Sequence, residues 1–504
     1  MTPSKHSRYF DDHREHAELG RQSLHGGVFS IASKGIIVFV QVGSQVILAR
    51  ILAPSDFGLV AMVAAFTGFI PVLSDLGTRD AAVQRASITE HEVSALFWLT
   101  VGIGAALGLM LAACGPLISS YYDEPRLTDI ALLSSVGFAI SAASCQHFAL
   151  LRRAMQFRSI AAVEVAANLL SSIAAIVMAL MGAGYWALVA KPVLLATFTL
   201  MGVMTACRWW PGIPKLTQGV KDMLRFGLNI TGFTMADYAG RSVDRIAIGK
   251  RSGAEPLGYY QQAVFVYDNV LNLLALSLHP VAVASLSKLT DNLPELKRAW
   301  SKAIGTLAFF AMPLFGLLAI TADDAISLVL GEKWEYTGFL VGILALRGIP
   351  HTIERTLGWL HVPAGRADRW MRWGLIGTSI QILALFCGLP FGVLGVVTSY
   401  VVSMYLLFIP TIVYAGAPLG IGTRDLLRAI GGPLVGALLM CALGFFLRYF
   451  LLQSVNHIAR ILILVTSCAP VYLIIVVGMF RKVHPLQVAA RVARDFLQRK
   501  KVTE

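Results

Sequence analysis

The stretch IARILILVTSCAPVYLIIVVGMF, residues 458–480, decides the fold class. It contains one charged residue, Arg460, and about 20 apolar residues in an α-helix are enough to cross a bilayer. Comparable apolar runs recur from about residue 26 onward. The chain of 504 residues is 56% hydrophobic and only 14% charged, whereas soluble domains are about 25% charged. We therefore predict an all-α polytopic membrane protein.

The apolar runs predict fourteen transmembrane helices, separated by gaps of about 16 residues at most. The run at 223–248 has the weakest hydropathy. The expected limits are 27–49, 57–78, 93–118, 128–150, 160–182, 184–206, 223–248, 258–284, 300–321, 338–360, 371–389, 391–414, 428–450 and 457–480.

The positive charges of the connecting segments predict the orientation. Fourteen Lys and Arg residues lie in the even-numbered gaps and five in the odd-numbered gaps. Because Lys and Arg concentrate in cytoplasmic loops, both termini are predicted to be cytoplasmic. The last residues, 481–504, are basic and have apolar residues on one helical face, which is typical of a helix on an anionic membrane surface; a solvated tail is the alternative.

An internal repeat divides the chain. ARILAPSDFGLV (49–60) resembles GKRSGAEPLGYY (249–260), so that Gly58 corresponds to Gly258, and ISSYYDEPRLTDIALL (118–133) pairs with ISLVLGEKWEYTGFLV (326–341). Six helices separate the paired segments, which indicates a parallel repeat about an axis along the membrane normal. The predicted parts are a cytoplasmic tail (1–25), an N-terminal six-helix lobe (26–206), a C-terminal six-helix lobe (223–414), two extra helices (428–480) and a basic cytoplasmic tail (481–504).

Four charged residues lie on one side of the seventh predicted helix: Asp237, Arg241, Asp244 and Arg245. Ionisable groups are costly in hydrocarbon, so they usually line a hydrated cavity or a substrate path. The planar guanidinium suits bidentate contacts with phosphate, so we predict Arg241 and Arg245 as substrate contacts. Asp237 and Asp244 are candidates for ion coupling or gating. The alternative is an ion-pair lattice that closes a periplasmic gate.

The tenth predicted helix repeats this spacing of four, three and one residues with Arg347, His351, Glu354 and Arg355. We predict that the two helices share a central cavity, with Arg347 and Arg355 as substrate contacts. His351 and Glu354 are candidates for ion coupling or gating. The alternative places Glu354 and Arg355 at the cytoplasmic interface.

The first predicted helix carries three further polar residues on one face, Lys34, Gln41 and Gln45. We include them as substrate-binding candidates, although Lys34 could equally extend to the inner interface. Glu164 and Asp268 are lone charges in spans and are candidates for ion coupling; structural pairing is the default for any single one. Asp75, His147 and Lys191 are the remaining lone ionisable residues.

Other site chemistries are not predicted. The six cysteines contain no C-x-x-C pair, which disfavours a disulfide framework or a metal site. The chain has no Walker A sequence, so neither ATP hydrolysis nor a nucleotide cofactor is expected. The net charge of +13 comes from short loops rather than from one basic domain, which disfavours a nucleic-acid partner. We predict no catalytic residue.

Three segments resemble bacterial polysaccharide flippases: GGVFSIASKGIIVFVQVGSQVILARILAPSDFGLVAMV (26–63), SDLGTRDAAVQR (74–85) and LRRAMQFRSIAAVEV (151–165). They are similar to the Wzx-like group of the multidrug/oligosaccharidyl-lipid/polysaccharide exporter superfamily, near the colanic acid exporters. The resemblance implies an inner-membrane transporter that flips undecaprenyl-pyrophosphate-linked oligosaccharide between leaflets by alternating access, coupled to Na⁺ or H⁺, for exopolysaccharide or lipopolysaccharide biosynthesis. The implied partners are this glycan, membrane lipids and other polysaccharide-assembly proteins.

Two rival functions remain at this point. A drug/cation antiporter of the same superfamily should have an acidic cavity, whereas the charges predicted here are mixed to basic. A membrane glycan polymerase or ligase usually needs a sizeable periplasmic loop with catalytic groups, and the predicted loops are short. We therefore predict a transporter and not an enzyme.

Overall fold

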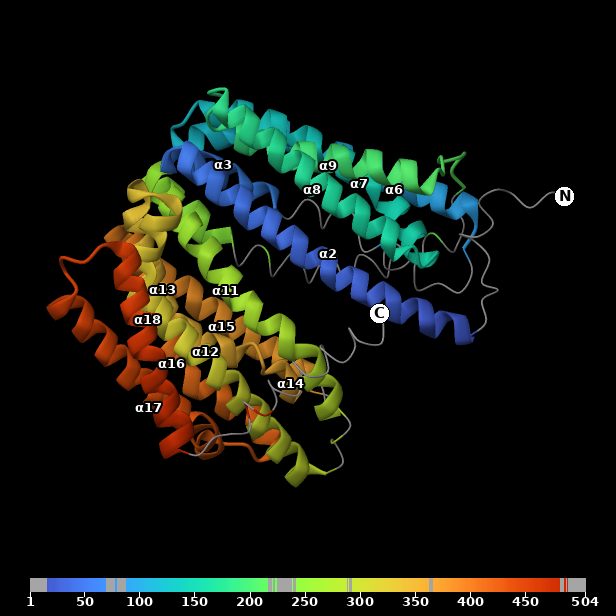
Figure 1. The fold of residues 1–504 in the computed structure, drawn as a ribbon. Coiled ribbons are helices and arrows are strands. Elements are labelled where there is room, and N and C mark those ends of the chain that lie inside the picture. Colours follow the sequence, from blue (N-terminus) through green and yellow to red (C-terminus); the bar gives the residue numbers. More distant parts are fainter. Residues whose placement is uncertain are drawn as a thin grey trace, which may run out of the picture. The chain divides into compact units, whose positions relative to one another are not determined.

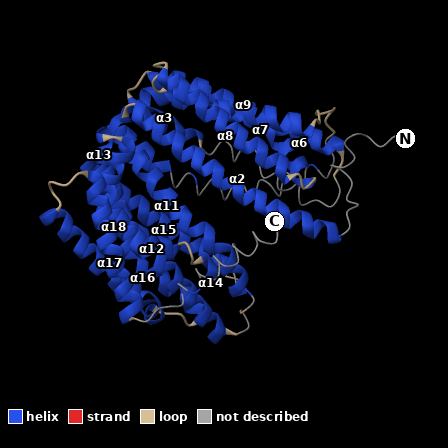
Figure 2. Ribbon diagram, in the orientation of Figure 1, coloured by secondary structure: helices blue, strands red, loops and turns tan. Residues whose placement is uncertain are grey.

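The computed structural model describes residues 16–68, 78, 88–215, 220, 223, 238, 242–287, 289, 292–361, 366–480, 485 and 487 (Figure 1). Every regular element within these residues is helical (Figure 2). Nine helices of the described part are long and apolar enough to cross a membrane. The prediction of an all-helical polytopic protein is confirmed, while the count of fourteen helices stays a prediction. The chain divides into two compact units, Met1–Gly258 and Tyr259–Glu504.

The helices of the first unit follow the predicted spans closely. The first begins earlier than expected, because HAELGRQSL continues it without a proline, so residues 16–25 of the predicted tail are helical. Residues 242–252 are also helical. The named helices are α2 (His16–Ile51), α3 (Pro54–Thr67), α6 (Glu90–Tyr122), α7 (Arg126–Arg153), α8 (Phe157–Leu180) and α9 (Trp186–Cys207).

Local sequence explains how α6 begins and how it packs on α7. Thr89 and Glu92 form a reciprocal capping box, in which the Thr89 hydroxyl accepts from the Glu92 N–H and the Glu92 carboxylate accepts from the Thr89 N–H at 2.9 Å. Further along, a Cβ on Gly108 would lie 2.6 Å from the Ser135 carbonyl oxygen. Small residues therefore bring the two backbones close together, as in many membrane helix pairs. In the connection, the Arg126 guanidinium binds Glu124 and lowers the pKa of that carboxyl.

The second unit contains the remaining helices. Helix α11 begins in the first unit and continues through the boundary. The elements are α11 (Ala254–Ser287), α12 (Leu293–Leu330), η1 (Glu332–Trp334), α13 (Glu335–Glu354), α14 (Gly358–His361), α15 (Ala367–Gly388), η2 (Leu389–Phe391), α16 (Gly392–Gly416), η3 (Ala417–Leu419), α17 (Thr423–Phe446), η4 (Leu447–Leu451), α18 (His457–Leu473) and η5 (Ile474–Met479).

The predicted span 338–360 is interrupted in the structure. Helix α13 ends at Glu354, and a turn at 355–357 separates it from α14. Pro350 lies inside the last turns of α13 and cannot donate a helical hydrogen bond. The Thr356 hydroxyl donates to the Ile353 carbonyl at 2.6 Å, which stabilises the turn. Arg355 therefore lies in the turn beyond the end of α13 and not within a helix.

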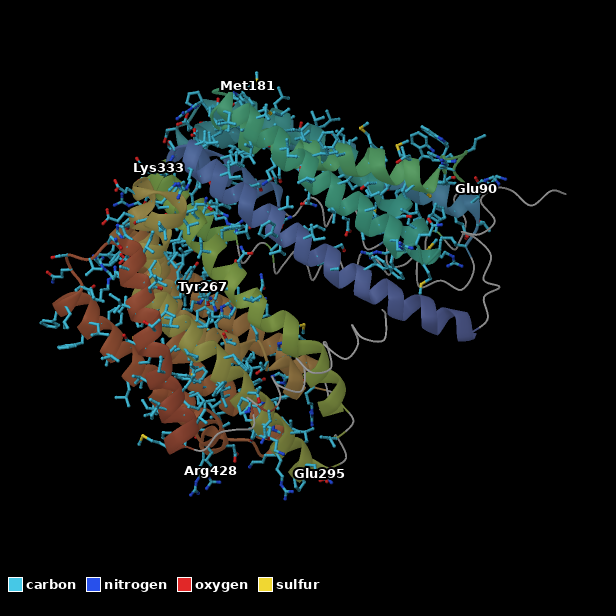
Figure 3. The ribbon with its side chains drawn as sticks, viewed as in Figure 1. Glu90, Met181, Tyr267, Glu295, Lys333 and Arg428 are labelled. Carbon is cyan, nitrogen blue, oxygen red and sulfur yellow. The ribbon has the colours of Figure 1, made fainter. Side chains whose placement is uncertain are left out.

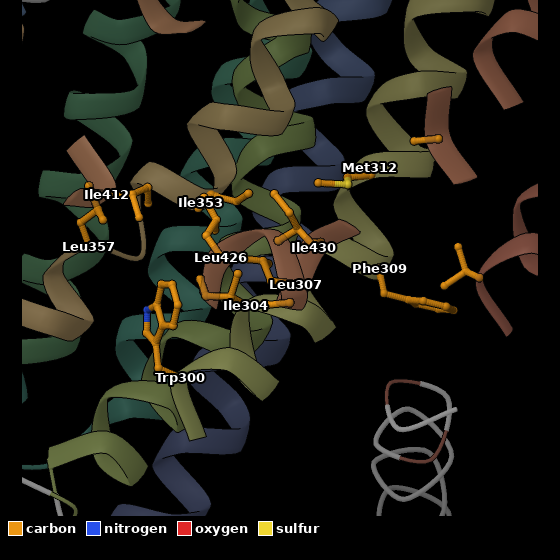
Figure 4. Packing of buried hydrophobic residues seen from close by; sticks show 14 of the residues in the cluster. Trp300, Ile304, Leu307, Phe309, Met312, Ile353, Leu357, Ile412, Leu426 and Ile430 are labelled. Atoms are coloured by element: carbon orange, nitrogen blue, oxygen red, sulfur yellow. The ribbon is translucent and has the colours of Figure 1, made fainter. Parts of the chain in front are cut away.

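Helix α12 forms the centre of the core of the second unit. Trp300, Ile304 and Met312 are fully buried, and they belong to a cluster with Ile430 of α17 and Tyr472 of α18, part of which Figure 4 shows. The Tyr472 hydroxyl donates to the Phe309 carbonyl at 2.8 Å. The two helices predicted as an addition to the lobes thus pack directly on α12.

Candidate functional site

The first unit contains a cavity of about 530 Å³, lined by residues of α2, α3, α7, α8 and α9. Apolar side chains form most of its wall. Glu164 of α8 is the one charged residue among the lining residues. The polar lining residues are Thr67, Ser134, Ser141, Ser144, Glu164, Asn168 and Thr199. One of the predicted ion-coupling candidates therefore lies in the wall of a cavity.

A hydrogen-bonded network connects three helices beside this cavity. The Gln41 side chain on α2 donates to the Asn168 side-chain oxygen at 3.1 Å, and Asn168 donates to the backbone carbonyl of Glu164 at 2.9 Å. On the other side, the Lys191 ammonium donates to the Ser44 hydroxyl at 2.7 Å. Ser44 in turn donates to the Gln41 carbonyl at 3.0 Å. The network joins α9 to α2 and α2 to α8.

The carboxylate of Glu164 has no hydrogen-bond or ion-pair partner within the part of the chain that the structure describes. The Glu164 side chain is half-buried in the cavity wall, so its carboxylate is accessible to a ligand that enters the cavity. Lys34 and Gln45, the other predicted residues of α2, are exposed and half-buried, respectively. Their substrate-binding role stays a prediction.

The second unit carries a polar face on α13. The Tyr267 hydroxyl of α11 (labelled in Figure 3) is 2.7 Å from His351 Nδ1, and the two rings stack with their centroids 6.0 Å apart. One turn earlier, the Arg347 guanidinium lies over the ring of Tyr400 of α16, 5.5 Å from its centroid. Two predicted residues, Arg347 and His351, are thus positioned by aromatic rings from two other helices.

The Arg347 side chain has hydrogen-bonding capacity to spare. Its Nε atom is buried and without a hydrogen-bond partner, and no carboxylate of the described residues lies within 4.0 Å of the guanidinium. A buried donor without a partner is costly, so this N–H needs an acceptor such as a water, an ion or a ligand. Glu354 is half-buried on the same helix, and Arg355 donates to the Asn272 side chain at 3.0 Å.

The charged cluster of the seventh predicted helix is only partly described. Asp237 and Arg241 lie outside the described residues. Asp244 and Arg245 are half-buried in the helical segment 242–252, where the Asp244 carboxylate accepts from the Arg245 N–H at 2.7 Å. Asp268 follows Tyr267 on α11 and is exposed. A cavity shared by the seventh and tenth predicted helices stays a prediction.

Sequence reasoning missed a second set of charges in the second unit. Asp324, near the end of α12, is 1% exposed and accepts from His457 Nδ1 at 2.7 Å and Arg460 Nη1 at 2.9 Å. Arg448 pairs with Asp323 at 2.8 Å and lies 3.6 Å from Asp324. This Asp324 cluster, formed by these five residues, attaches η4 and α18 to α12. The sequence signal was the Asp-Asp pair, which hydropathy assigns to a loop.

The family profile of "Polysaccharide biosynthesis protein" matches residues 47–337, more than half of the chain. The chain belongs to this family. One relative is the teichuronic acid biosynthesis protein TuaB of Bacillus subtilis (strain 168), which is 24% identical over 74% of this chain and 78% of TuaB. The lipopolysaccharide biosynthesis protein WzxC of Escherichia coli (strain K12) is 24% identical over 73% of this chain and 76% of WzxC. The predicted relationship to Wzx-type proteins is confirmed.

Solved structures agree on the fold of this family member. The lipid II flippase MurJ in an inward closed conformation has a TM-score of 0.70 at 15% identity, over 90% of this chain and 99% of MurJ. An inward-facing MATE family transporter of the MOP superfamily has a TM-score of 0.55 at 14% identity, over 76% of this chain and 94% of that transporter. The chain therefore has the helical fold of these membrane transporters.

Proposed function

We propose that this protein flips an oligosaccharide carried on undecaprenyl pyrophosphate from the inner to the outer leaflet of the bacterial inner membrane, for surface polysaccharide synthesis. Three findings support the proposal: the family match over residues 47–337, relatives named for teichuronic acid and lipopolysaccharide biosynthesis, and a fold similar to that of a lipid II flippase. Arg347 of α13 favours an anionic substrate over the cations of a drug antiporter.

Arg347 is the observation that carries the substrate chemistry. Its guanidinium rests on the ring of Tyr400, which orients it by a cation–π contact and leaves its N–H edge for an acceptor. Pyrophosphate oxygens are acceptors that match this edge in a bidentate geometry. The glycan needs a polar path, while the polyprenyl tail stays in the bilayer. Arg355, in the turn after α13, offers a second cation on this side of the unit and donates to the Asn272 side chain.

We place the coupling ion at Glu164 of the first unit. In a largely apolar cavity, a bound proton or Na⁺ would neutralise a carboxylate that has no protein partner among the described residues. The adjacent network through Asn168, Gln41, Ser44 and Lys191 connects this event to α2 and α9. Occupancy at Glu164 would thereby bias the packing of three helices, as alternating access requires.

The complete architecture under this proposal is fourteen helices, with two six-helix lobes (26–206 and 223–414), two extra helices and both termini in the cytoplasm. The charges at Lys34, Arg241, Arg245 and Arg355 would line the path with Arg347. Asp237, Asp244, His351, Glu354 and Asp268 would serve gating or coupling. Other polysaccharide-assembly proteins would receive the flipped glycan.

The decisive experiment replaces Arg347 by Gln in a strain that lacks the chromosomal copy. Losing a hydrogen bond to a charged group costs about 1.5–3 kcal/mol, so export should fall by about 10-fold or more. Lipid-linked repeat units should accumulate in the inner leaflet, as measured by a membrane-impermeant glycan probe in inverted and right-side-out vesicles. Arg372→Gln is the matched control, because Arg372 is exposed on α15 with its nearest carboxylate 3.9 Å away.

Normal export by the Arg347→Gln variant at normal protein level would remove Arg347 from the substrate path. Accumulation of the units in the outer leaflet after deletion of the gene would indicate a polymerase or ligase and contradict the flippase proposal.

A further inference from the structure

Arg369, in the first turn of α15, is held against the end of α16. Its guanidinium lies over the ring of Tyr414, 4.2 Å from the ring centroid, and its Nη2 donates to the Tyr414 carbonyl at 2.8 Å. Trp373, one turn further along α15, stacks on the same Tyr414 with the ring centroids 4.7 Å apart, and its Nε1 donates to the Thr411 hydroxyl at 3.0 Å. The cation–π contact and these hydrogen bonds fix the orientation of the guanidinium.

This guanidinium keeps a donor that has no acceptor. The Nε atom of Arg369 is buried and has no hydrogen-bond partner, and no carboxylate of the described residues lies within 4.0 Å of the side chain. Arg372 on the same helix differs, because Asp368 lies 3.9 Å from it and partly offsets its charge. Leaving a buried donor unpaired is unfavourable, so Arg369 requires an acceptor from outside the described part of the chain.

The surroundings of Arg369 are basic. Arg366, the exposed residue that precedes α15, lies one helical turn before Arg369, so the two side chains are neighbours. Where the chain turns from α16 into α17, the Lys297 ammonium of α12 donates to the Gly420 carbonyl at 3.0 Å and pairs with Asp425 at 2.8 Å. Figure 3 labels two further charged residues, Arg428 and Glu295, at this end of the second unit. Three more arginines are exposed on the first turns of α12 and α17: Arg298, Arg424 and Arg428.

An exposed apolar surface begins beside these cations. Four apolar side chains of α16 recur every three or four residues and therefore form one stripe, which ends at the residue before Tyr414. Their exposed fractions are 56% for Val402, 71% for Leu406, 43% for Ile409 and 47% for Val413. Trp370, next to Arg369, is 48% exposed, as is typical of aromatic rings at the level of lipid headgroups. A ligand that has both an anionic head and apolar chains matches this combination.

We propose that Arg369 and Arg366 bind the phosphate headgroup of an anionic phospholipid, whose acyl chains lie along the exposed stripe of α16. Guanidinium groups bind phosphate oxygens by short charge-assisted hydrogen bonds, and basic pockets between membrane helices are suited to such headgroups. A phosphate oxygen supplies the acceptor that Nε of Arg369 lacks. The lipid thereby joins α15 to α16 at the membrane surface. This site takes a resident lipid and is separate from the substrate path proposed at Arg347.

The first test measures lipid binding directly. Protein freed of lipid in detergent is titrated with phosphatidylglycerol, and the bound lipid is counted by native mass spectrometry. Arg369→Gln should weaken the affinity by about 10-fold, because it removes a hydrogen bond to a charged group. Diacylglycerol with the same acyl chains should bind weakly to both proteins. Arg298→Gln is the matched control: it removes one exposed positive charge at the same end of the unit and should bind the lipid as wild type does.

A second variant and a second readout separate lipid binding from a structural role of Arg369. Arg366 is exposed, so Arg366→Gln should fold normally and weaken the affinity by about threefold, as expected for an exposed charge. Phosphatidylglycerol should raise the Tm of the wild type and of Arg298→Gln more than that of Arg369→Gln. A purely structural Arg369 would lower the Tm without lipid and leave the lipid affinity unchanged. Should Arg369→Gln fail to fold, unchanged affinity of Arg366→Gln overturns the inference.

Two competitors identify the source of the phosphate. Displacement of phosphatidylglycerol by an equal concentration of inorganic phosphate would make this a site for free phosphate. Tighter binding of undecaprenyl pyrophosphate than of phosphatidylglycerol, lost in Arg369→Gln, would make it a docking site for the transported lipid. Either result overturns the assignment to a resident phospholipid. None of these measurements involves transport, so their failure leaves the proposed function untouched, and a failure of flipping leaves the lipid site untouched.

Discussion

Replacing Asp324 by Asn is expected to loosen the attachment of α18 to α12. The change keeps the size of the side chain and removes its charge. The lost carboxylate is 1% exposed and lies within 2.9 Å of both His457 and Arg460, with Arg448 at 3.6 Å. After the substitution, Arg448 keeps its ion pair with Asp323, whereas Arg460 keeps hydrogen bonds to backbone carbonyls of the 452–456 connection.

The magnitude follows from the burial of the pair. Removing one partner of a buried ion pair costs about 3–5 kcal/mol, because the other charge is left uncompensated. Asn can still accept one hydrogen bond, so we expect a value near the lower end, about 3 kcal/mol. In a protein of this size, this corresponds to a fall in the apparent Tm of roughly 3 °C.

The assay is thermal unfolding of the detergent-solubilised protein, followed by tryptophan fluorescence. Limited proteolysis is run in parallel, because cleavage in the 452–456 connection should become faster if α18 detaches. Asp368→Asn is the control: its partner Arg372 is 3.9 Å away and both are exposed, so the Tm should change by less than about 1 °C. A Tm of Asp324→Asn within 1 °C of wild type would refute the assignment of this cluster as a structural attachment.

Two further predictions concern the first unit. The Glu164→Gln variant should fold normally but reduce export by about 10-fold or more in a surface-polysaccharide assay, because Gln cannot bind and release the coupling ion. The control is Glu332→Gln, at an exposed carboxylate on η1, which should export normally in the same assay. Thr89→Ala should lower stability by about 1 kcal/mol through loss of the capping box with Glu92, whereas Thr89→Ser should retain the wild-type Tm; equal Tm values for the two variants would contradict this role.

The sequence predicted the helices well where a local property determines them. The expected spans 93–118 and 128–150 lie inside α6 and α7, because an apolar run of bilayer length is visible in one dimension. The break within 338–360 was not predicted. Its causes are local: Pro350 in the helix and the hydrogen bond of the Thr356 hydroxyl in the turn. Two such residues change the mean hydropathy of the whole segment very little.

The sequence predicted which charged residues belong to the candidate site, but not which residues of other helices contact them. Arg347 and Glu164 stand out because they are charged residues within apolar runs. Tyr400 does not stand out, since a tyrosine in a helix has no special pattern until another helix brings a guanidinium over its ring. The same holds for Asn168, which becomes notable through its bond to Gln41, 127 residues away in sequence.

Structural charges differ from candidate functional charges in whether they are paired with an opposite charge, and not in how deeply they are buried. Asp324 is buried and paired with Arg448, His457 and Arg460 at 3.6, 2.7 and 2.9 Å, so its charge holds helices together although its Oδ2 atom accepts no hydrogen bond. Arg347 has a buried donor and no described carboxylate within ion-pair distance, so its charge remains for a ligand. Hydropathy places Arg347 in a span and Asp324 in a loop, and it identifies neither charge as paired or unpaired, because that difference lies in which side chains from other helices surround each one. A transporter needs both kinds: paired charges keep each unit rigid, and spare ones attract the anion that the moving parts carry across.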